Sequence, residues 1–207
     1  SSGSAVAVAA GMCLGALGTD TGGSIRIPAA LCGIVGLKPT FWRVSLRGVF
    51  PLSWSLDHAG PLVRSVRDAA YLLQVIAGYD PLDPGSTNAP AGDYLLDIDR
   101  GVRGWRVAVA GGDYFAALDP EVSAAFDQAV DLFRSLGAVV TRQDMPFLRD
   151  AAIANGIIIG ADAAAFHRER LEARPEGFGA DVRQRLEIGA RRTGMEYALA
   201  RRTQSEM

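Results

Sequence analysis

Between residues 65 and 141 the apolar positions follow two clear periods, one typical of helices and one of strands. Ser65 opens the first stretch, with an acidic residue three positions later. A serine followed at this spacing by an acid is a capping signal at the start of a helix. The apolar residues that follow at helical spacing are Ala69, Leu72, Leu73 and Ile76. The pattern predicts a helix that begins at Ser65 and ends at Gly78.

A strand, a helix and a second strand are predicted next. Residues 105–110 have the composition of a strand, and Asp119-Pro120-Glu121 is typical of a helix start. The apolar face of this helix consists of Val122, Phe126, Val130 and Phe133. Gly137 ends the helix before the second strand at 138–141. Because this order is compatible with a parallel strand pair, we expect an α/β fold in which helices flank both faces of a mixed sheet.

The first forty residues are predicted to form four short elements around a loop at residues 17–26. Pro28 suits the first turn of a helix, and Gly11 is a plausible helix stop. In chain order these elements are a tightly packed helix at 4–11, a buried strand at 14–18, a helical turn at 27–31 and a buried strand at 33–37. The loop therefore lies at a strand end and faces the start of a helix.

The other segments are less regular. Residues 40–61 indicate loops and short strands, in which Ser55-Leu56-Asp57 is a candidate pocket wall, and residues 80–99 indicate an irregular surface excursion. In the last third, three helices are expected: 150–173, interrupted near Gly156 and Gly160; 181–189; and one from the capping box of Thr193 and Glu196 to Met207.

The composition is that of an ordinary globular protein. Apolar residues make up 49% of the 207 positions, charged residues 21%, and the formal net charge is -2. Nothing is basic enough to indicate a nucleic-acid or membrane surface, and we expect no membrane partner and a cytoplasmic location. Cys13 and Cys32 are expected to be buried free thiols. No metal or cofactor is expected, because His58 and His167 lie far apart without metal-ligand partners.

The loop at 17–26 holds the candidate chemistry. Gly22 and Gly23 precede Ser24, so little side-chain bulk hinders backbone N–H groups from turning toward whatever the serine hydroxyl attacks. A Walker phosphate loop is excluded, because no lysine precedes the serine, and the nucleophile-elbow pattern is incomplete, because position 26 is Arg. From spacing alone, Ser24 is either an acyl nucleophile or the N-cap of the following helix.

Three runs of the sequence favour the first alternative: residues 1–11, 18–30 and 33–40. Together they closely resemble the signature of the amidase signature family, and the resemblance continues more loosely through residues 55–61 and 65–78 before it fades near residue 80. Members of this family hydrolyse carboxamides through a Ser, cis-Ser, Lys triad. The resemblance implies that Ser24 is the nucleophile and that the backbone N–H groups of Thr21, Gly22, Gly23 and Ser24 form the oxyanion hole.

The resemblance also implies that two triad members lie outside this chain. The bridging serine falls one position before Ser1, and the catalytic lysine lies further upstream. Lys38, the only lysine, matches a different segment and is interpreted as structural. We therefore expect residues 1–207 to be part of a single amidase domain, with a signature core at 1–80 and a variable α/β and helical portion at 81–207, and to be inactive alone.

Charge patterning bears on packing and on partners. Asp20 and Arg26 flank the loop and are expected to form an ion pair beneath it. Four arginines near the end of the chain suggest RNA contact or, more simply, a solvated helix face, because Glu187, Glu196 and Glu206 interleave with them. These arginines are Arg191, Arg192, Arg201 and Arg202.

Three functions stay open at this point. The first is an amidase that acts on a small-molecule carboxamide and releases ammonia or an amine. The second is the glutamine amidase subunit of a tRNA-dependent amidotransferase, which is the one case in which nucleic acid would be a partner. The third is a noncatalytic binding relative in which Ser24 caps a turn. Homo-oligomerisation is compatible with all three.

Overall fold

The computed structural model describes residues 1–115 and 117–207 and has an α/β architecture, as expected. Its first half is built on β3 (His58–Val63), which lies between β1 (Gly15–Asp20) and β2 (Val35–Gly36) and is antiparallel to both. Asp20, the last residue of β1, stands opposite His58. The order β1-β3-β2 brings the end of β1, where the serine loop begins, next to the start of β3.

Strand β3 is more prominent than the sequence pattern indicates. Its residues from Ala59 to Val63 are all buried. Gly60 and Pro61 are poor strand formers, which is why this segment was predicted as part of a region of loops and short strands. Gly60 is needed because a Cβ there would lie only 2.3 Å from the carbonyl oxygen of Leu37. The strand predicted at 14–18 forms but is not buried throughout, since Leu17 is 53% exposed.

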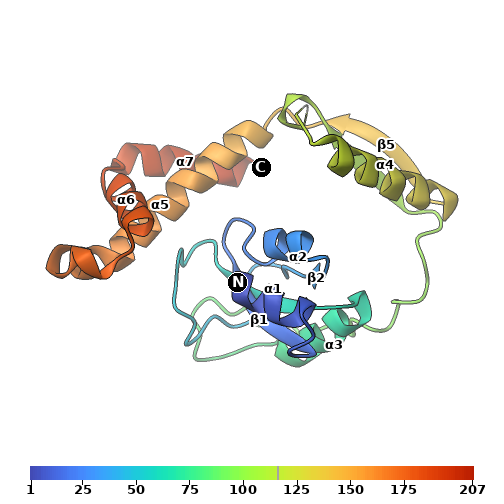
Figure 1. Cartoon of the computed structure of the whole chain (residues 1–207), viewed down its shortest axis with the longest axis horizontal. Coiled ribbons are helices and arrows are strands. Elements are labelled where there is room, and N and C mark those ends of the chain that lie inside the picture. The colour runs from blue at the N-terminus through green and yellow to red at the C-terminus, as the bar shows by residue number, and fades with distance from the viewer. Residues whose placement is uncertain (116) are drawn as a thin grey trace.

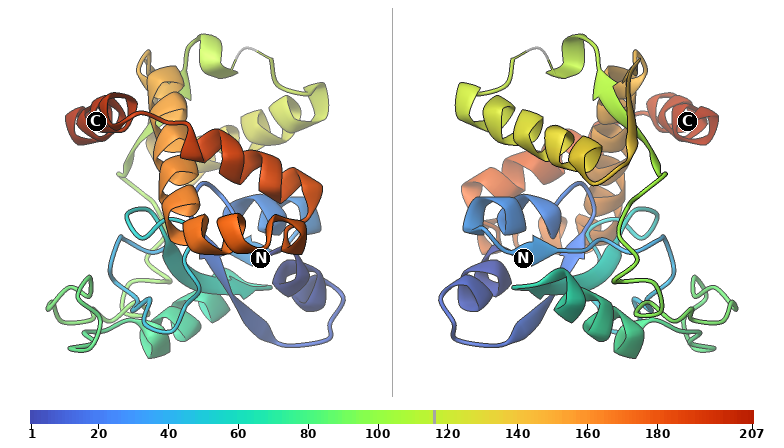
Figure 2. Two further views of the ribbon diagram at one scale, coloured as in Figure 1. Left: turned by 90° about the vertical axis from the view of Figure 1, so that its left-hand side faces the viewer. Right: turned by 90° about the vertical axis from the view of Figure 1, so that its right-hand side faces the viewer.

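Helices cover both faces of this sheet (Figure 2). On one face, Leu62 packs with Ala5, Ile25 and Ala29 in a buried cluster. On the other face lies the helix predicted from Ser65, whose hydroxyl accepts a hydrogen bond from the Asp68 N–H. Successive strand residues point to opposite faces, so β3 joins both layers. The helices concerned are α1 (Ser2–Ala9), α2 (Arg26–Cys32) and α3 (Val66–Ile76).

The predicted strand–helix–strand unit forms a second, separate sheet. The strands β4 (Arg106–Gly111) and β5 (Val139–Asp144) pair in parallel, with Arg106 opposite Val139. A short helical turn, η1 (Asp113–Phe115), follows β4, and α4 (Pro120–Ser135) packs on β5. The described residues therefore contain one antiparallel and one parallel sheet, and Figure 1 shows them at separate places in the molecule.

The C-terminal part is helical, as predicted, but α5 is not interrupted. It runs unbroken through Gly156 and Gly160. At Gly160 the helix packs closely against α6: a Cβ on Gly189 of α6 would lie 2.0 Å from the Gly160 carbonyl oxygen. The capping box of Thr193 and Glu196 is confirmed. The elements are α5 (Leu148–Ala173), η2 (Pro175–Gly177), α6 (Ala180–Ala190) and α7 (Gly194–Glu206).

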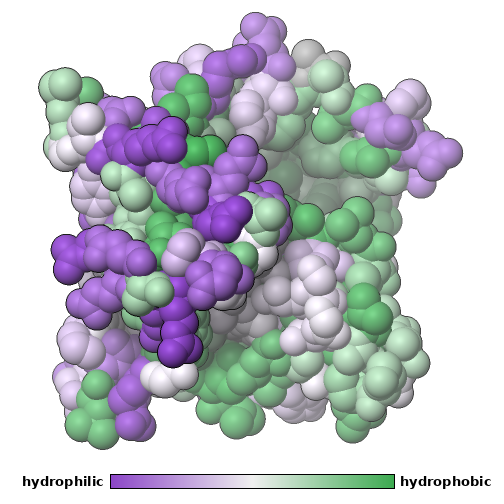
Figure 3. Space-filling model, turned by 60° about the vertical axis from the view of Figure 1, so that its left-hand side comes forward, coloured by the Kyte–Doolittle hydropathy of each residue, from purple (hydrophilic) through white to green (hydrophobic). Residues whose placement is uncertain are grey.

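Apolar side chains are widely exposed on this chain. Figure 3 shows them gathered over much of one face, and Met12, Leu14, Leu31 and Val75 are each more than three-quarters exposed. Cys13 and Cys32 are free thiols, as expected, but half-buried rather than buried. Within residues 1–115 and 117–207, no helix is long and apolar enough to cross a membrane.

Candidate active site

Ser24 lies in the short loop that connects β1 to α2, and its side chain is exposed. The helix α2 has Ile25 as its N-cap, with no side-chain capping bond. Ser24 therefore does not act as the N-cap, which was the alternative to a nucleophile. Gly23, directly before Ser24, has a φ of +129°, a backbone conformation that residues with a side chain rarely adopt.

The buried carboxylate of Asp20 holds the loop from beneath. It accepts hydrogen bonds from the N–H groups of Gly23 (2.8 Å) and Ile25 (3.2 Å) and pairs with the Arg26 guanidinium at 2.9 Å. Burial by itself would raise the pKa of Asp20, but the bonds from Arg26, Gly23 and Ile25 outweigh it and lower that pKa to about 2. The predicted ion pair is confirmed, and its carboxylate also fixes the backbone.

The four predicted oxyanion-hole residues differ in their bonding. The Gly23 N–H donates to Asp20, whereas the N–H groups of Thr21, Gly22 and Ser24 have no acceptor among residues 1–115 and 117–207. These three donors are free to bind an anion. The oxyanion hole itself stays a prediction.

The side chain of Thr21 is held from the other side. Its hydroxyl donates to Oδ1 of Asp57 at 2.5 Å, and both residues are buried. The other Asp57 oxygen, Oδ2, accepts from the N–H groups of Leu52 (2.8 Å) and Ser53 (3.1 Å). The sequence indicated the turn 55–57 only as a pocket wall; the bond to Thr21 spans 36 residues and no local pattern indicates it.

A cavity of about 340 Å³ opens beside the loop. Thr21, Gly22 and Leu56 form one side, so the turn 55–57 does contribute to a pocket wall. The opposite side comes from helices, chiefly α5, whose Asn155 side-chain nitrogen lies 3.2 Å from where a Cβ on Gly22 would be. Arg26, Ala151, Ala154, Ile158, Gln204 and Met207 complete the lining. Sequence reasoning missed α5 here because its alanine-rich pattern contains no recognisable motif.

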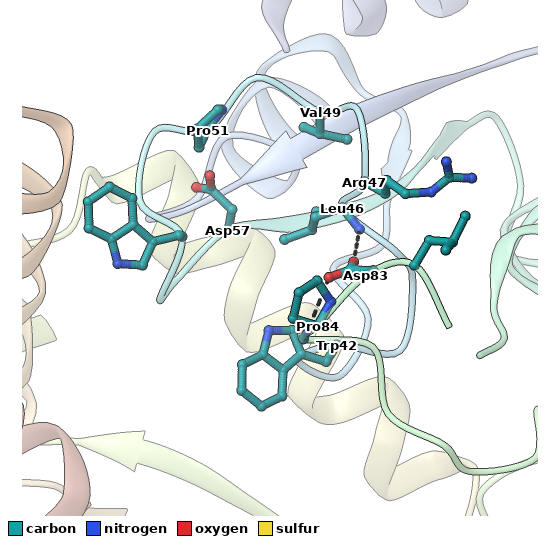
Figure 4. Close-up of a pocket in the computed structure, with 11 residues that line it drawn as sticks. Trp42, Leu46, Arg47, Val49, Pro51, Asp57, Asp83 and Pro84 are labelled. Atoms are coloured by element: carbon teal, nitrogen blue, oxygen red, sulfur yellow. Dashed lines mark hydrogen bonds between the residues drawn. The ribbon is translucent and has the colours of Figure 1, made fainter. Parts of the chain in front are cut away.

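A larger cavity of about 450 Å³ has Asp57 in its wall (Figure 4). Two tryptophans line it: Trp42, which has an unusual φ of +58°, and Trp54, which is half exposed rather than in the core. Asp83, on its wall, accepts from the Leu46 N–H. Its lining residues include none from the loop that carries Ser24, whereas Thr21 and Gly22 of that loop line the smaller cavity, so the smaller cavity is the better candidate for chemistry.

Lys38 and His58 lie near the loop without reaching Ser24 through any hydrogen bond. The Lys38 ammonium donates to the carbonyl of Pro39 at 2.8 Å, and burial together with the charge of Arg26 lowers its pKa. Burial and the charge of Lys38 likewise lower the pKa of His58, so its imidazole is neutral at pH 7. These contacts support the structural interpretation of Lys38.

Comparison with known proteins identifies the family of the chain. The sequence profile of the family described as Amidase matches residues 1–207. The chain is 44% identical to an amidase of Pseudomonas putida, covering 93% of this chain and 41% of that protein. It is 42% identical to the A subunit of the glutamyl-tRNA(Gln) amidotransferase of Geobacter sp. (strain M21), covering 91% and 43%.

A solved structure is similar over nearly the whole chain. It comes from a protein complex described as revealing the evolutionary origins of an s-triazine catabolic enzyme. The TM-score is 0.89 at 37% identity, covering 97% of this chain and 43% of that one. The chain spans about two-fifths of the length of the curated relatives that it matches.

Proposed function

Because this chain belongs to the amidase signature family, we propose that it carries the nucleophile of an enzyme that hydrolyses the C–N bond of a carboxamide. The observation that supports this most directly is the exposed Ser24 in a loop that has free backbone N–H groups and whose Thr21 and Gly22 line a cavity. The nucleophile is Ser24, and the amide enters through the cavity between the loop and α5.

The reaction forms and breaks an acyl-enzyme. The oxygen of Ser24 attacks the amide carbon, its proton passes to the serine and lysine relay that the family resemblance implies, and the carbonyl oxygen becomes an oxyanion. Collapse of this intermediate breaks the C–N bond, and the relay protonates the departing nitrogen to give ammonia or an amine. Water then attacks the ester carbonyl, the bond to the Ser24 oxygen breaks, and the carboxylic acid leaves while the Ser24 hydroxyl is restored.

The oxyanion hole is proposed to use the loop backbone. Thr21, Gly22 and Ser24 supply the free N–H groups, while Gly23 supplies the left-handed backbone turn that aims them and keeps its own bond to Asp20. Removing one preorganised donor of this kind reduces the stabilisation of the transition state by about 3 kcal/mol. The glycine backbone is therefore expected to matter almost as much as the serine hydroxyl.

A second candidate is the glutamine amidase subunit of a tRNA-dependent amidotransferase. The similarity to the Geobacter protein favours it. A partner-dependent enzyme of this class would release ammonia from glutamine faster when its partner protein and charged tRNA are added. The C-terminal arginines give this candidate no support, because Arg192 and Arg202 form ion pairs with the nearby Glu196 and Glu206.

The test is covalent labelling of the full-length gene product with a fluorophosphonate, followed by peptide mass mapping. We expect an adduct on Ser24 that is lost in Ser24→Ala. The matched control is Ser135→Ala on α4, whose hydroxyl donates to a backbone carbonyl and which should leave labelling unchanged. A folded protein that remains unlabelled at Ser24 would overturn the proposal and favour a noncatalytic relative.

A further inference from the structure

We propose that Asp57 is a positioning residue for the oxyanion hole and that it acts through the hydroxyl of Thr21. This inference rests on the proposed function, because it concerns how the loop around Ser24 is held ready for the reaction. Asp57 does not line the cavity that Thr21 and Gly22 line, and among the described residues its one hydrogen bond with the loop comes from the Thr21 hydroxyl.

Hydrogen-bond donors, not ion pairs, hold the carboxylate of Asp57 within the described residues. Asp57 is 3% exposed, and within the described residues no lysine or arginine forms an ion pair with it. Three donors bind this carboxylate: the Thr21 hydroxyl and the N–H groups of Leu52 and Ser53. Hydrogen bonds to a buried charge are strong, and losing one leaves an unsatisfied anion. The Thr21 hydroxyl is therefore held firmly.

The bond to Asp57 also constrains the backbone of Thr21. Thr21 is β-branched, so fixing its hydroxyl fixes its side-chain rotamer, which is coupled to its backbone dihedral angles. The peptide unit between Thr21 and Gly22 carries the free Gly22 N–H. Asp57 thus sets the direction of one proposed oxyanion donor from one side of the loop.

The serine loop is held at two points. Asp20 binds the N–H groups of Gly23 and Ile25, and Asp57 binds Thr21, so that Gly22 lies between two fixed residues. Donors that are fixed before reaction need no reorganisation when charge develops, which is the basis of electrostatic preorganisation.

Asp57 is itself anchored to more distant parts of the chain. The N–H of Ser53 donates a hydrogen bond to Asp57. The hydroxyl of Ser53 donates to the buried carboxylate of Asp162 on α5 at 2.5 Å, and the hydroxyl of Ser55 donates to the same Asp162 oxygen at 2.7 Å. The Tyr197 hydroxyl of α7 donates to the other Asp162 oxygen at 3.0 Å. The turn that carries Asp57 is therefore tied to the C-terminal helices.

The experiment measures kcat and KM for amide hydrolysis by the full-length protein and two single variants. Thr21→Val keeps the shape of threonine but removes the hydroxyl, and Thr21→Ser keeps the hydroxyl. We expect Thr21→Val to lower kcat by about 10- to 100-fold with KM within about threefold of wild type, because the lost interaction aims transition-state donors. Thr21→Ser should stay within about fivefold of wild-type kcat, which a purely steric role of the threonine would not predict.

A double-mutant cycle tests whether Asp57 acts through Thr21. Asp57→Asn should lower kcat to a similar extent, and Thr21→Val/Asp57→Asn should be no slower than the slower single variant. Losses that multiply would show that Asp57 acts by another route and would overturn the inference. If Asp57→Asn does not fold, the Thr21 pair alone decides the question.

The remaining outcomes separate this inference from the proposed function. Wild-type kcat in Thr21→Val, with Ser24 still labelled by the fluorophosphonate, would overturn the role of Asp57 and leave the amidase proposal intact. An equal loss in Thr21→Val and Thr21→Ser would also overturn it. Failure of the wild-type protein itself to label at Ser24 would reject the amidase proposal and, with it, this inference.

Discussion

Asp20 is a single residue whose ionisation is coupled to the shape of the serine loop. Its pKa of about 2 lies below the ordinary value of 3.8, so the ionised form stabilises the folded state at every pH above about 4. Protonation removes the charge of the carboxylate and so weakens its bonds to Arg26, Gly23 and Ile25. The loop is therefore expected to loosen only as the pH falls toward 2.

We expect the free energy of unfolding to fall by about 2 kcal/mol between pH 4 and pH 2 through Asp20 alone. Urea unfolding of the full-length protein at several pH values measures this, and Asp20→Asn should flatten the acid limb of the curve. Asp131→Asn is the matched control, because Asp131 is 73% exposed in its pair with Arg134. Identical acid limbs for Asp20→Asn and wild type would contradict the prediction.

Individual residues differ in how far sequence could predict them. The Asp20–Arg26 pair was predictable, because two opposite charges six positions apart at the two ends of a tight loop must lie close to each other. The bond between Thr21 and Asp57 was not, because it joins segments that only the pairing of β1 with β3 brings together. Resemblance identified Ser24 as the candidate nucleophile, yet it gave no sign that the Gly23 N–H is bonded to Asp20.

At the scale of elements, the sequence predicted the start of a helix correctly wherever a capping residue marks it. The helices after Ser65, Asp119 and Thr193 all begin with the predicted side-chain cap. Errors arose where tertiary contact overrode propensity. The interior glycines of α5 lower its helix propensity, but Gly160 permits close contact with α6, and β3 tolerates Gly60 because another backbone segment lies against it.

A pair of glycine substitutions tests this explanation of the α5–α6 contact. Gly189→Ala should destabilise the protein by about 2 kcal/mol, because its Cβ would meet the Gly160 backbone, which cannot move aside as a side chain can. Gly156→Ala, in α5 itself with no atom within 4 Å of the added Cβ, should stabilise by about 0.5–1 kcal/mol. Thermal and denaturant unfolding measure both, and equal shifts would refute the packing explanation.

At the scale of the whole molecule, residues 1–207 expose more surface than a compact protein of this mass. The accessible area is 13481 Å², whereas a globular monomer of 21.9 kDa exposes roughly 9,300 Å². The unit of β4, β5 and α4 packs mainly on itself, which contributes to the open shape in Figure 1. Large apolar side chains contribute to this surface, among them Leu14, Leu31 and Val75.

This surface predicts how residues 1–207 behave when expressed alone. We expect them to self-associate and to bind the dye ANS, because large exposed apolar patches are unstable in water. Light scattering and dye fluorescence measure both, with the full-length gene product as the comparison. Amide hydrolysis should stay at background, since the implied lysine and bridging serine are not among these residues. A stable, monomeric and active preparation would contradict both the surface argument and the assignment of the triad.

The double role of α5 constrains how such an enzyme could change its substrate during evolution. Asn155, beside the cavity, and Asp162, which anchors the turn before Asp57, are seven residues apart and so face the same side of one rigid helix two turns from each other. An insertion or deletion between them would rotate one away from its partners. New specificities can therefore arise by exchanging side chains at cavity positions, whereas the length of the helix between them is inherited unchanged.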